Sequence, residues 1–117
     1  SKIMKLPDAE FKLVGKSGHR YNFTAYTLEE EFEKGSCGIY VFTSYNYVTN
    51  IHSKFIYCGQ SGDLSERFDN HHKIKCIKAN EANCIGIMLV HNPEALNKYE
   101  TDLLEGNSFI CNEQHQN

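Results

Sequence analysis

Residues 38–43 read GIYVFT and residues 55–59 read FIYCG, and these two stretches decide the predicted fold. Both are rich in β-branched and aromatic residues, which favour strands. The first alternates in the manner of a strand over residues 38–43, and the second predicts a shorter strand over residues 55–58. The polar residues 44–53 lie between them. We therefore expect two antiparallel strands that a long loop connects.

Further strands are predicted on both sides of this pair. Residues 11–14 and 20–26 are β-rich and flank a Gly-Lys-Ser-Gly turn, which predicts an N-terminal hairpin. Residues 84–90 form a continuous apolar run, which is compatible with a central strand.

Three helices are predicted from the signals at their ends. Capping-box spacing predicts one helix over residues 27–34 and another over residues 63–72. Asn92 and Pro93 open a last helix, which Gly106 ends. The predicted fold class is α/β (α+β), with a small central three-stranded antiparallel sheet flanked by helices and an N-terminal β-hairpin extension.

Length and composition bound the domain organisation. The chain has 117 residues, of which 40% are hydrophobic, enough for one modest core. We expect one domain, in which residues 1–34 are a hairpin and short helix that extend the core of residues 35–112, and residues 113–117 are a polar tail. The longest apolar run is far shorter than the roughly 20 residues of a membrane span, so we expect a soluble, cytoplasmic protein with no membrane partner.

The cysteines predict a reducing compartment. They are odd in number and form no Cys-x-x-Cys pair, which argues against a disulfide framework. We expect five free thiols, at Cys37, Cys58, Cys76, Cys84 and Cys111.

Charge is unevenly distributed along the chain. The formal net charge of −3 argues against a polyphosphate partner, because such affinity comes largely from Lys and Arg. Residues 71–78 nevertheless read HHKIKCIK, without an acidic residue. This basic strip is a candidate phosphate-binding surface, and a solvated loop is the alternative. Its candidate contacts are His72, Lys73, Lys75 and Lys78.

Glu100 is a candidate metal ligand. In the last predicted helix it shares a stripe with Leu96, Leu103 and Leu104, and none of these neighbours is basic. A carboxylate beside buried surface costs free energy unless it is paired or bound to a cation. The alternative is a glutamate at the edge of the stripe that reaches water.

Arg67 and His71 are four residues apart in a predicted helix. A guanidinium can bind a phosphate through two parallel hydrogen bonds, and an imidazole can transfer a proton at neutral pH. The alternative is an ion pair between Asp63 and Arg67 with a surface histidine. Tyr40 and Tyr57, on neighbouring predicted strands, would each be core residues if taken alone.

The order of these residues resembles the GIY-YIG nuclease domain family over about residues 38–112. Gly38-Ile39-Tyr40 matches the first signature of that family, and Tyr57-Cys58-Gly59 matches the second. The family has an arginine in the helix after the second signature, a histidine or tyrosine four residues later, a glutamate in a later helix and an asparagine near the end. Those positions are occupied here by Arg67, His71, Glu100 and Asn112.

The resemblance implies a divalent-metal-dependent endonuclease that hydrolyses phosphodiester bonds in DNA, with RNA as a second possible substrate. It implies that Glu100 holds a single Mg²⁺ or Mn²⁺. Tyr40 would activate the attacking water, with His71 as a relay or alternative base.

The remaining positions have supporting roles in that family resemblance. Arg67 would neutralise charge on the phosphoryl oxygens and would contact nucleic acid together with the basic strip. Tyr57 would orient the phosphate or the water. Asn112 would position the metal site through its amide.

One departure from the family bears on activity. Gln60 stands where related members often have Lys or Ser, and a lost lysine would weaken phosphate binding. The first alternative function is therefore a catalytically weak or inactive module of the same fold that binds nucleic acid or a protein, with residues 1–34 as a possible partner site. The second is a small zinc-binding protein that uses His71, His72, Cys76 and Cys84.

Overall fold

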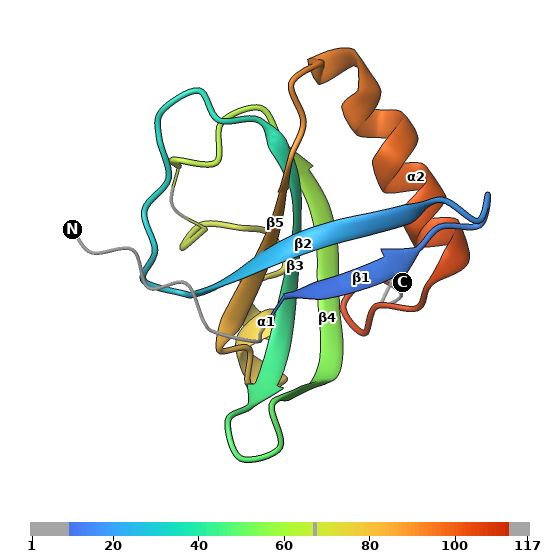
Figure 1. Ribbon diagram of the computed structural model, residues 1–117. Helices are drawn as coiled ribbons and strands as arrows, with labels where there is room; N and C mark the ends of the chain where they lie inside the picture. The colour runs from blue at the N-terminus through green and yellow to red at the C-terminus, as the bar shows by residue number, and fades with distance from the viewer. Residues whose placement is uncertain (1–9, 67, 113–117) are drawn as a thin grey trace.

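The computed structural model describes residues 10–66 and 68–112 (Figure 1). The expected polar tail of residues 113–117 lies outside the described residues, as do residues 1–9 and 67. The described elements, in chain order, are β1 (Phe11–Val14), β2 (Arg20–Thr27), β3 (Gly38–Asn46), β4 (Ile51–Ser61), α1 (Ile74–Ala79), β5 (Cys84–Leu89), the 3-10 turn η1 (Pro93–Ala95) and α2 (Leu96–Gly106).

All of the described strands belong to one antiparallel sheet with the order β1-β2-β5-β3-β4. The prediction of a three-stranded sheet is therefore wrong. The physical reason is that β5 pairs on both sides, with β3 along one edge and with β2 along the other, where Thr24 lies opposite Ile87 and Thr27 opposite Cys84. The N-terminal hairpin is thus part of the sheet and does not merely extend a smaller one.

The sheet curls so that its two edge strands approach each other. Phe11 of β1 packs against Phe55 of β4, with ring centroids 5.4 Å apart. Room for this contact comes from Gly86 in the middle strand, where an added Cβ would lie 2.3 Å from the Phe11 ring. Figure 1 shows β1 and β2 crossing steeply in front of β3 and β4. The curl makes a half-barrel with only two short helices among the described residues, so helices do not flank the sheet on all sides.

Both faces of the central strands are buried. Ile39 and Val41 of β3 belong to a cluster on the α2 side, together with Leu96 and Leu103 of α2. The alternate residues of β3 belong to a second cluster, which Leu64 and Ile77 cover. This double burial explains why Gly38–Thr43 reads as an apolar run. The predicted antiparallel pairing of the two signature strands is confirmed, but they are longer and only a tight turn over residues 47–50 separates them.

The predicted helix over residues 27–34 is wrong. Thr27 still pairs with Cys84 in the sheet, and the Glu30 N–H closes a single turn on the Thr27 carbonyl. Thr27 is therefore the last residue of a strand and does not cap a helix.

The predicted helix over residues 63–72 is also wrong, because its described residues form consecutive turns. The Asp63 carboxylate accepts hydrogen bonds from the backbone N–H groups of both Ser65 and Gly35, at 3.0 and 2.9 Å. The Leu64 N–H donates to the Ser36 carbonyl. Tertiary bonds to residues 35–36 thus replace helical ones, and the helix α1 begins only at Ile74.

The last helix confirms its sequence signals. The Asn92 side chain accepts from the Glu94 N–H at 3.1 Å, and Pro93 occupies the first turn. Asp102 of α2 then fixes the β1–β2 turn, because its carboxylate accepts hydrogen bonds from the Ser17 hydroxyl and from the Tyr21 hydroxyl, each at 2.7 Å. The N-terminal hairpin therefore positions α2. Neither α1 nor α2, nor any other helix in the described ranges, has the length and apolar character of a membrane-spanning segment.

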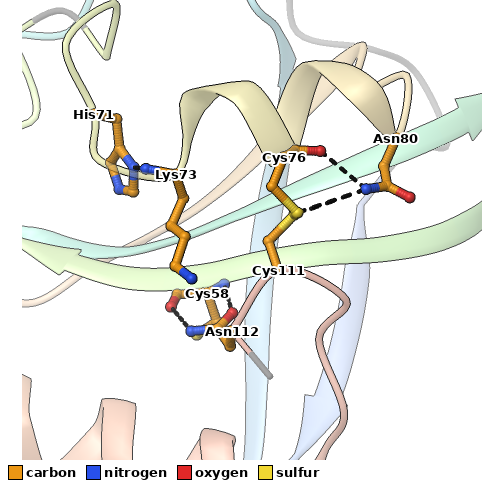
Figure 2. Close-up of a disulfide and its surroundings, with 7 residues drawn as sticks. All are labelled: Cys58, His71, Lys73, Cys76, Asn80, Cys111 and Asn112. Atoms are coloured by element: carbon orange, nitrogen blue, oxygen red, sulfur yellow. Dashed lines mark hydrogen bonds between the residues drawn. A yellow bond between two sulfur atoms is a disulfide. The ribbon is translucent and has the colours of Figure 1, made fainter. Parts of the chain in front are cut away.

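Residues 110–112 follow the outer edge of β4. The N–H groups of Ile110 and Cys111 donate to the carbonyls of Phe55 and Ile56. Cys111 is fully buried and forms a disulfide with Cys76 of α1 (Figure 2). The prediction of five free thiols is therefore wrong for these two cysteines, whereas the other three are free. A separation of 35 residues hid this pairing from sequence inspection.

We predict that thiol titration of the oxidised, denatured protein counts three free thiols and that the reduced protein gives five. Reduction should lower the free energy of unfolding by about 3 kcal/mol, because the disulfide restricts the unfolded chain. Urea unfolding with and without a thiol reductant measures this change. The variant Cys76→Ala is the control and should not respond to the reductant. Five free thiols in the oxidised wild type would contradict the disulfide.

Candidate functional site

Two tyrosines of the signatures lie on one face of the sheet. Tyr40 of β3 and Tyr57 of β4 have ring centroids 6.1 Å apart. Gly59 lies opposite Tyr40 in the strand register, and an added Cβ there would lie 2.6 Å from the Tyr40 hydroxyl and 2.9 Å from the Tyr57 ring. Glycine at position 59 is therefore required by the packing of the two phenols.

His71 joins this tyrosine pair. Its Nε2 lies 2.7 Å from the Tyr40 hydroxyl oxygen, and its ring packs edge-on against Tyr57 with centroids 4.8 Å apart. The Lys73 backbone N–H donates to His71 Nδ1 at 3.0 Å (Figure 2). Because a backbone N–H can only donate, the neutral imidazole carries its proton on Nε2. His71 Nε2 therefore donates to Tyr40, and the Tyr40 proton is left to point elsewhere.

Burial keeps these three side chains neutral. Burial raises the pKa of Tyr40 above its ordinary value, and the nearby Tyr57 and Glu100 raise it further. Burial and the charge of Glu100 likewise raise the pKa of Tyr57. The pKa of His71 is lowered by burial and then by His72 and Lys73. At neutral pH the cluster is therefore two phenols and an uncharged imidazole.

Glu100 lies half-buried on α2 and has a neutral partner. Gln60 Nε2 of β4 donates to Glu100 Oε1 at 2.7 Å and also approaches Asn97 Oδ1 at 3.3 Å. Within residues 10–66 and 68–112, no Lys or Arg forms an ion pair with Glu100. The sequence has no basic residue beside Glu100 in its helical stripe. The described residues likewise provide no Lys or Arg ion pair to Glu100 from other elements.

An open pocket lies beside Tyr40 and His71, and Glu100 is not among its lining residues. Its volume is about 390 Å³, and Gln60 is the residue that both lines it and hydrogen bonds to Glu100. The lining residues are Tyr40, Gln60, Ser61, Asp63, Glu66, Phe68, Asn70 and His71. Phe68 packs on Tyr40 with ring centroids 4.8 Å apart and so forms the wall behind the phenol.

Glu100 supplies the one carboxylate in its hydrogen-bonded group with Gln60 and Asn97, and no group of three or more His, Cys, Asp or Glu that could hold a metal ion is present among the described residues. Glu100 Oε2 has no hydrogen-bond partner in the described part of the chain, whereas Glu100 Oε1 and Asn97 Oδ1 both accept from Gln60 Nε2. Oxygen donors of this kind suit Mg²⁺ or Mn²⁺, which commonly keep several waters and use one or two carboxylates.

The zinc alternative finds no support. Cys76 is bonded to Cys111, and Cys84 is buried within β5. In the two described ranges, no group of three or more His, Cys, Asp or Glu side chains could hold a metal ion.

Asn112 acts on the backbone of β4. Its Oδ1 accepts from the Cys58 N–H at 2.8 Å, and its Nδ2 donates to the Cys58 carbonyl at 2.9 Å (Figure 2). Both ends of the amide are thus bonded to the residue between Tyr57 and Gly59. The structure gives Asn112 a way to position Tyr57 through the strand.

The residues of the basic strip lie in two places, beside the tyrosines and on α1. His72 lies beside the tyrosines, with its ring centroid 6.1 Å from that of Tyr57. Lys75 and Lys78 are exposed on α1, and Lys78 lines a different, largely apolar pocket. Arg67 lies outside the described residues, so its pairing with His71 stays a prediction.

Sequence inspection missed the role of Gln60. It interpreted this position as a lost lysine, whereas the structure bonds it to Glu100. A local signal was present, because side chains alternate between the two faces of a strand. Gln60 lies opposite Ile39, whose face of the sheet α2 covers.

Comparison with protein-family models, with curated proteins and with solved structures found no match for this chain.

We predict that His71 makes stability depend on pH in the weakly acidic range. Its pKa is lower in the folded protein, so the unfolded chain binds this proton more readily. Stability should therefore rise with pH from the lowered value to the ordinary one of about 6.5, and be constant above it.

The measurement is the urea midpoint between pH 5 and 8 for the wild type and for His71→Asn, whose shorter side chain can still accept from Lys73. The variant should show a flatter profile in this range. The exposed His91→Asn is the matched control and should keep the slope of the wild type. An unchanged slope in His71→Asn would contradict a buried neutral imidazole.

Proposed function

We propose that this protein is a divalent-metal-dependent endonuclease that hydrolyses phosphodiester bonds in DNA. The observation that carries the proposal is the Tyr40–His71 hydrogen bond in an open pocket that Gln60 links to Glu100. A phenol and an imidazole at one pocket, with a half-buried carboxylate bonded to a side chain that lines it, are the kinds of group that metal-assisted hydrolysis of a phosphate ester uses.

The hydrogen bonds favour Tyr40 as the base. The backbone N–H of Lys73 donates to His71 Nδ1, so the neutral imidazole has its proton on Nε2. His71 Nε2 therefore cannot accept a proton from Tyr40. His71 would instead stabilise the Tyr40 phenolate by donating to it, and that phenolate would take a proton from the attacking water. Tyr57, whose ring packs against His71, would orient the water or phosphate in the pocket.

Glu100 is the residue that would hold Mg²⁺ or Mn²⁺. The cation would polarise the scissile phosphate and stabilise the leaving oxygen. Gln60 would bind the carboxylate during this chemistry, and Asn112 would fix β4 beneath Tyr57.

DNA would lie across the basic side chains near the pocket. His72 is beside Tyr57, Lys73 directly precedes α1, and Lys75 lies in the first turn of α1. Such residues contact phosphates and position the duplex without selecting a sequence. Arg67 and Lys78 complete the proposed set of contacts. RNA is the second substrate class.

A cytoplasmic location stays a prediction. The argument for it from free thiols no longer holds, because the Cys76–Cys111 disulfide is of a kind that is rare in the cytosol.

One observation favours the inactive module as the second candidate. The carboxylates of Asp63 and Glu66 line the same pocket as Tyr40 and His71, and hydrogen bonds from Ser65 and Gly35 lower the pKa of Asp63. Negative charge at this position opposes the entry of a phosphate. Such a module would bind a protein partner, or nucleic acid through basic residues outside the pocket, without cleaving it.

Cleavage of supercoiled plasmid decides between the two candidates. We predict that the wild type nicks the plasmid with Mg²⁺ or Mn²⁺ and that Glu100→Gln lowers the rate by about a thousandfold. Loss of a residue that only orients a metal ligand costs about 10- to 100-fold, and loss of the ligand itself should cost more. Glu105→Gln, at an exposed position of the same helix, is the matched control and should cleave normally. Cleavage that persists in Glu100→Gln would reject the nuclease assignment.

We also predict that the cleavage rate rises with pH between 6 and 9. The raised pKa of Tyr40 makes its phenolate a minor species, and each increase in pH enlarges that fraction. Single-turnover rates at saturating Mg²⁺ measure the profile. Tyr40→Phe should lose most of the activity together with the pH dependence. A rate that falls with pH would indicate a protonated group as the essential form.

A further inference from the structure

Gln60 occupies the place where the two halves of the site meet. It is near the end of β4, one residue after Gly59, and its backbone lies opposite Ile39. Tyr40 and Tyr57 lie on one face of the sheet, whereas α2 with Glu100 covers the other. Gln60 lines the pocket of Tyr40 and His71 and also reaches Glu100.

The Gln60 amide is fixed by its two acceptors. A primary amide nitrogen has two N–H donors, and here they meet Glu100 Oε1 at 2.7 Å and Asn97 Oδ1 at 3.3 Å. With both donors engaged on α2, the amide cannot turn over without losing these bonds. The glutamate is in turn bound through one carboxylate oxygen, and its second oxygen is left without a partner among the described residues.

We propose that Gln60 is a positioning residue that orients the Glu100 carboxylate for a divalent cation without neutralising its charge. This inference rests on the proposed function, in which Glu100 is the metal ligand. A neutral donor restrains the carboxylate and leaves its full negative charge to attract the cation. A lysine at position 60 would also reach Glu100, but its positive charge would repel the metal and pair with its ligand.

The proposal reverses the meaning of the missing lysine. A lysine here would favour contact with a phosphate, whereas a neutral amide leaves the full charge of Glu100 to the cation. Glutamine favours the metal. The residue therefore tunes the concentration of divalent cation that the site requires.

The experiment compares Gln60→Met and Gln60→Lys with the wild type and with Glu105→Gln as the matched control. Methionine keeps the length of the side chain and removes both donors. Mn²⁺ binding to the protein alone is followed by electron paramagnetic resonance, and the Mn²⁺ concentration for half-maximal plasmid cleavage is measured in parallel. Thermal unfolding checks that each variant is folded, and Gln60→Met alone decides the test if the lysine variant is not.

We expect Gln60→Met to raise the half-maximal Mn²⁺ concentration by about 10- to 100-fold, as for other residues that orient a metal ligand, while most of the rate returns at saturating Mn²⁺. Gln60→Lys should raise it further. Glu105→Gln should match the wild type. This split between metal requirement and maximal rate is the signature of a positioning role.

Other outcomes overturn the proposal in distinguishable ways. If both Gln60 variants keep the Mn²⁺ midpoint of the wild type while Glu100→Gln loses Mn²⁺ binding, the positioning role is wrong and the metal assignment stands. A lower maximal rate with an unchanged midpoint also rejects it, since that would be a structural defect. If Glu100→Gln binds Mn²⁺ as the wild type does, or the wild type does not bind Mn²⁺, both the metal assignment and this inference fail.

Discussion

The outer edge of β4 is the constraint on which the site depends. An edge strand has unpaired backbone groups along one side, and here residues 110–112 pair with them. The bonds from Asn112 surround Cys58, and the residues on either side of Cys58 are Tyr57 and Gly59. Tyr57 belongs to the site, and Gly59 provides the space in which the Tyr40 phenol lies. The disulfide from Cys111 then attaches this edge to α1, and so to the turn that presents His71.

The sheet separates two electrostatic environments. On one face the tyrosines are buried and His71 is half-buried, and burial disfavours the ionised form of each. On the other face Glu100 is a charged group on a helix that the β1–β2 turn fixes through Asp102. The charge of Glu100 is nevertheless close enough to raise the pKa of both tyrosines. The two faces therefore influence each other around the end of β4, and Gln60 is the side chain that spans that end.

The sequence predicted those elements whose signals agree with their tertiary surroundings. The two signature strands, the central strand β5 and the capped helix α2 are confirmed, since apolar periodicity and an Asn-Pro start reflect burial and a local cap. The two other capping boxes predicted helices that do not form. Thr27 pairs with Cys84 in the sheet, and the Asp63 carboxylate accepts from the N–H of Gly35, 28 residues away in the sequence. The site followed the same pattern. The cluster of Tyr40, Tyr57 and His71 was expected, and the Gln60–Glu100 bond across 40 residues was not.

The glycines of the two signatures are explained by packing and not by catalysis. A Cβ at Gly38 would lie 2.4 Å from the Met88 carbonyl oxygen of β5, and one at Gly59 would collide with Tyr40. Any protein with this sheet and these aromatic residues would need both glycines, whether or not it cleaves a substrate. The signatures thus report the scaffold. The proposed activity would depend instead on groups that the scaffold does not require. Packing against Tyr57 would accept another aromatic ring in place of His71, and a helix position beside the core does not otherwise favour a carboxylate such as Glu100.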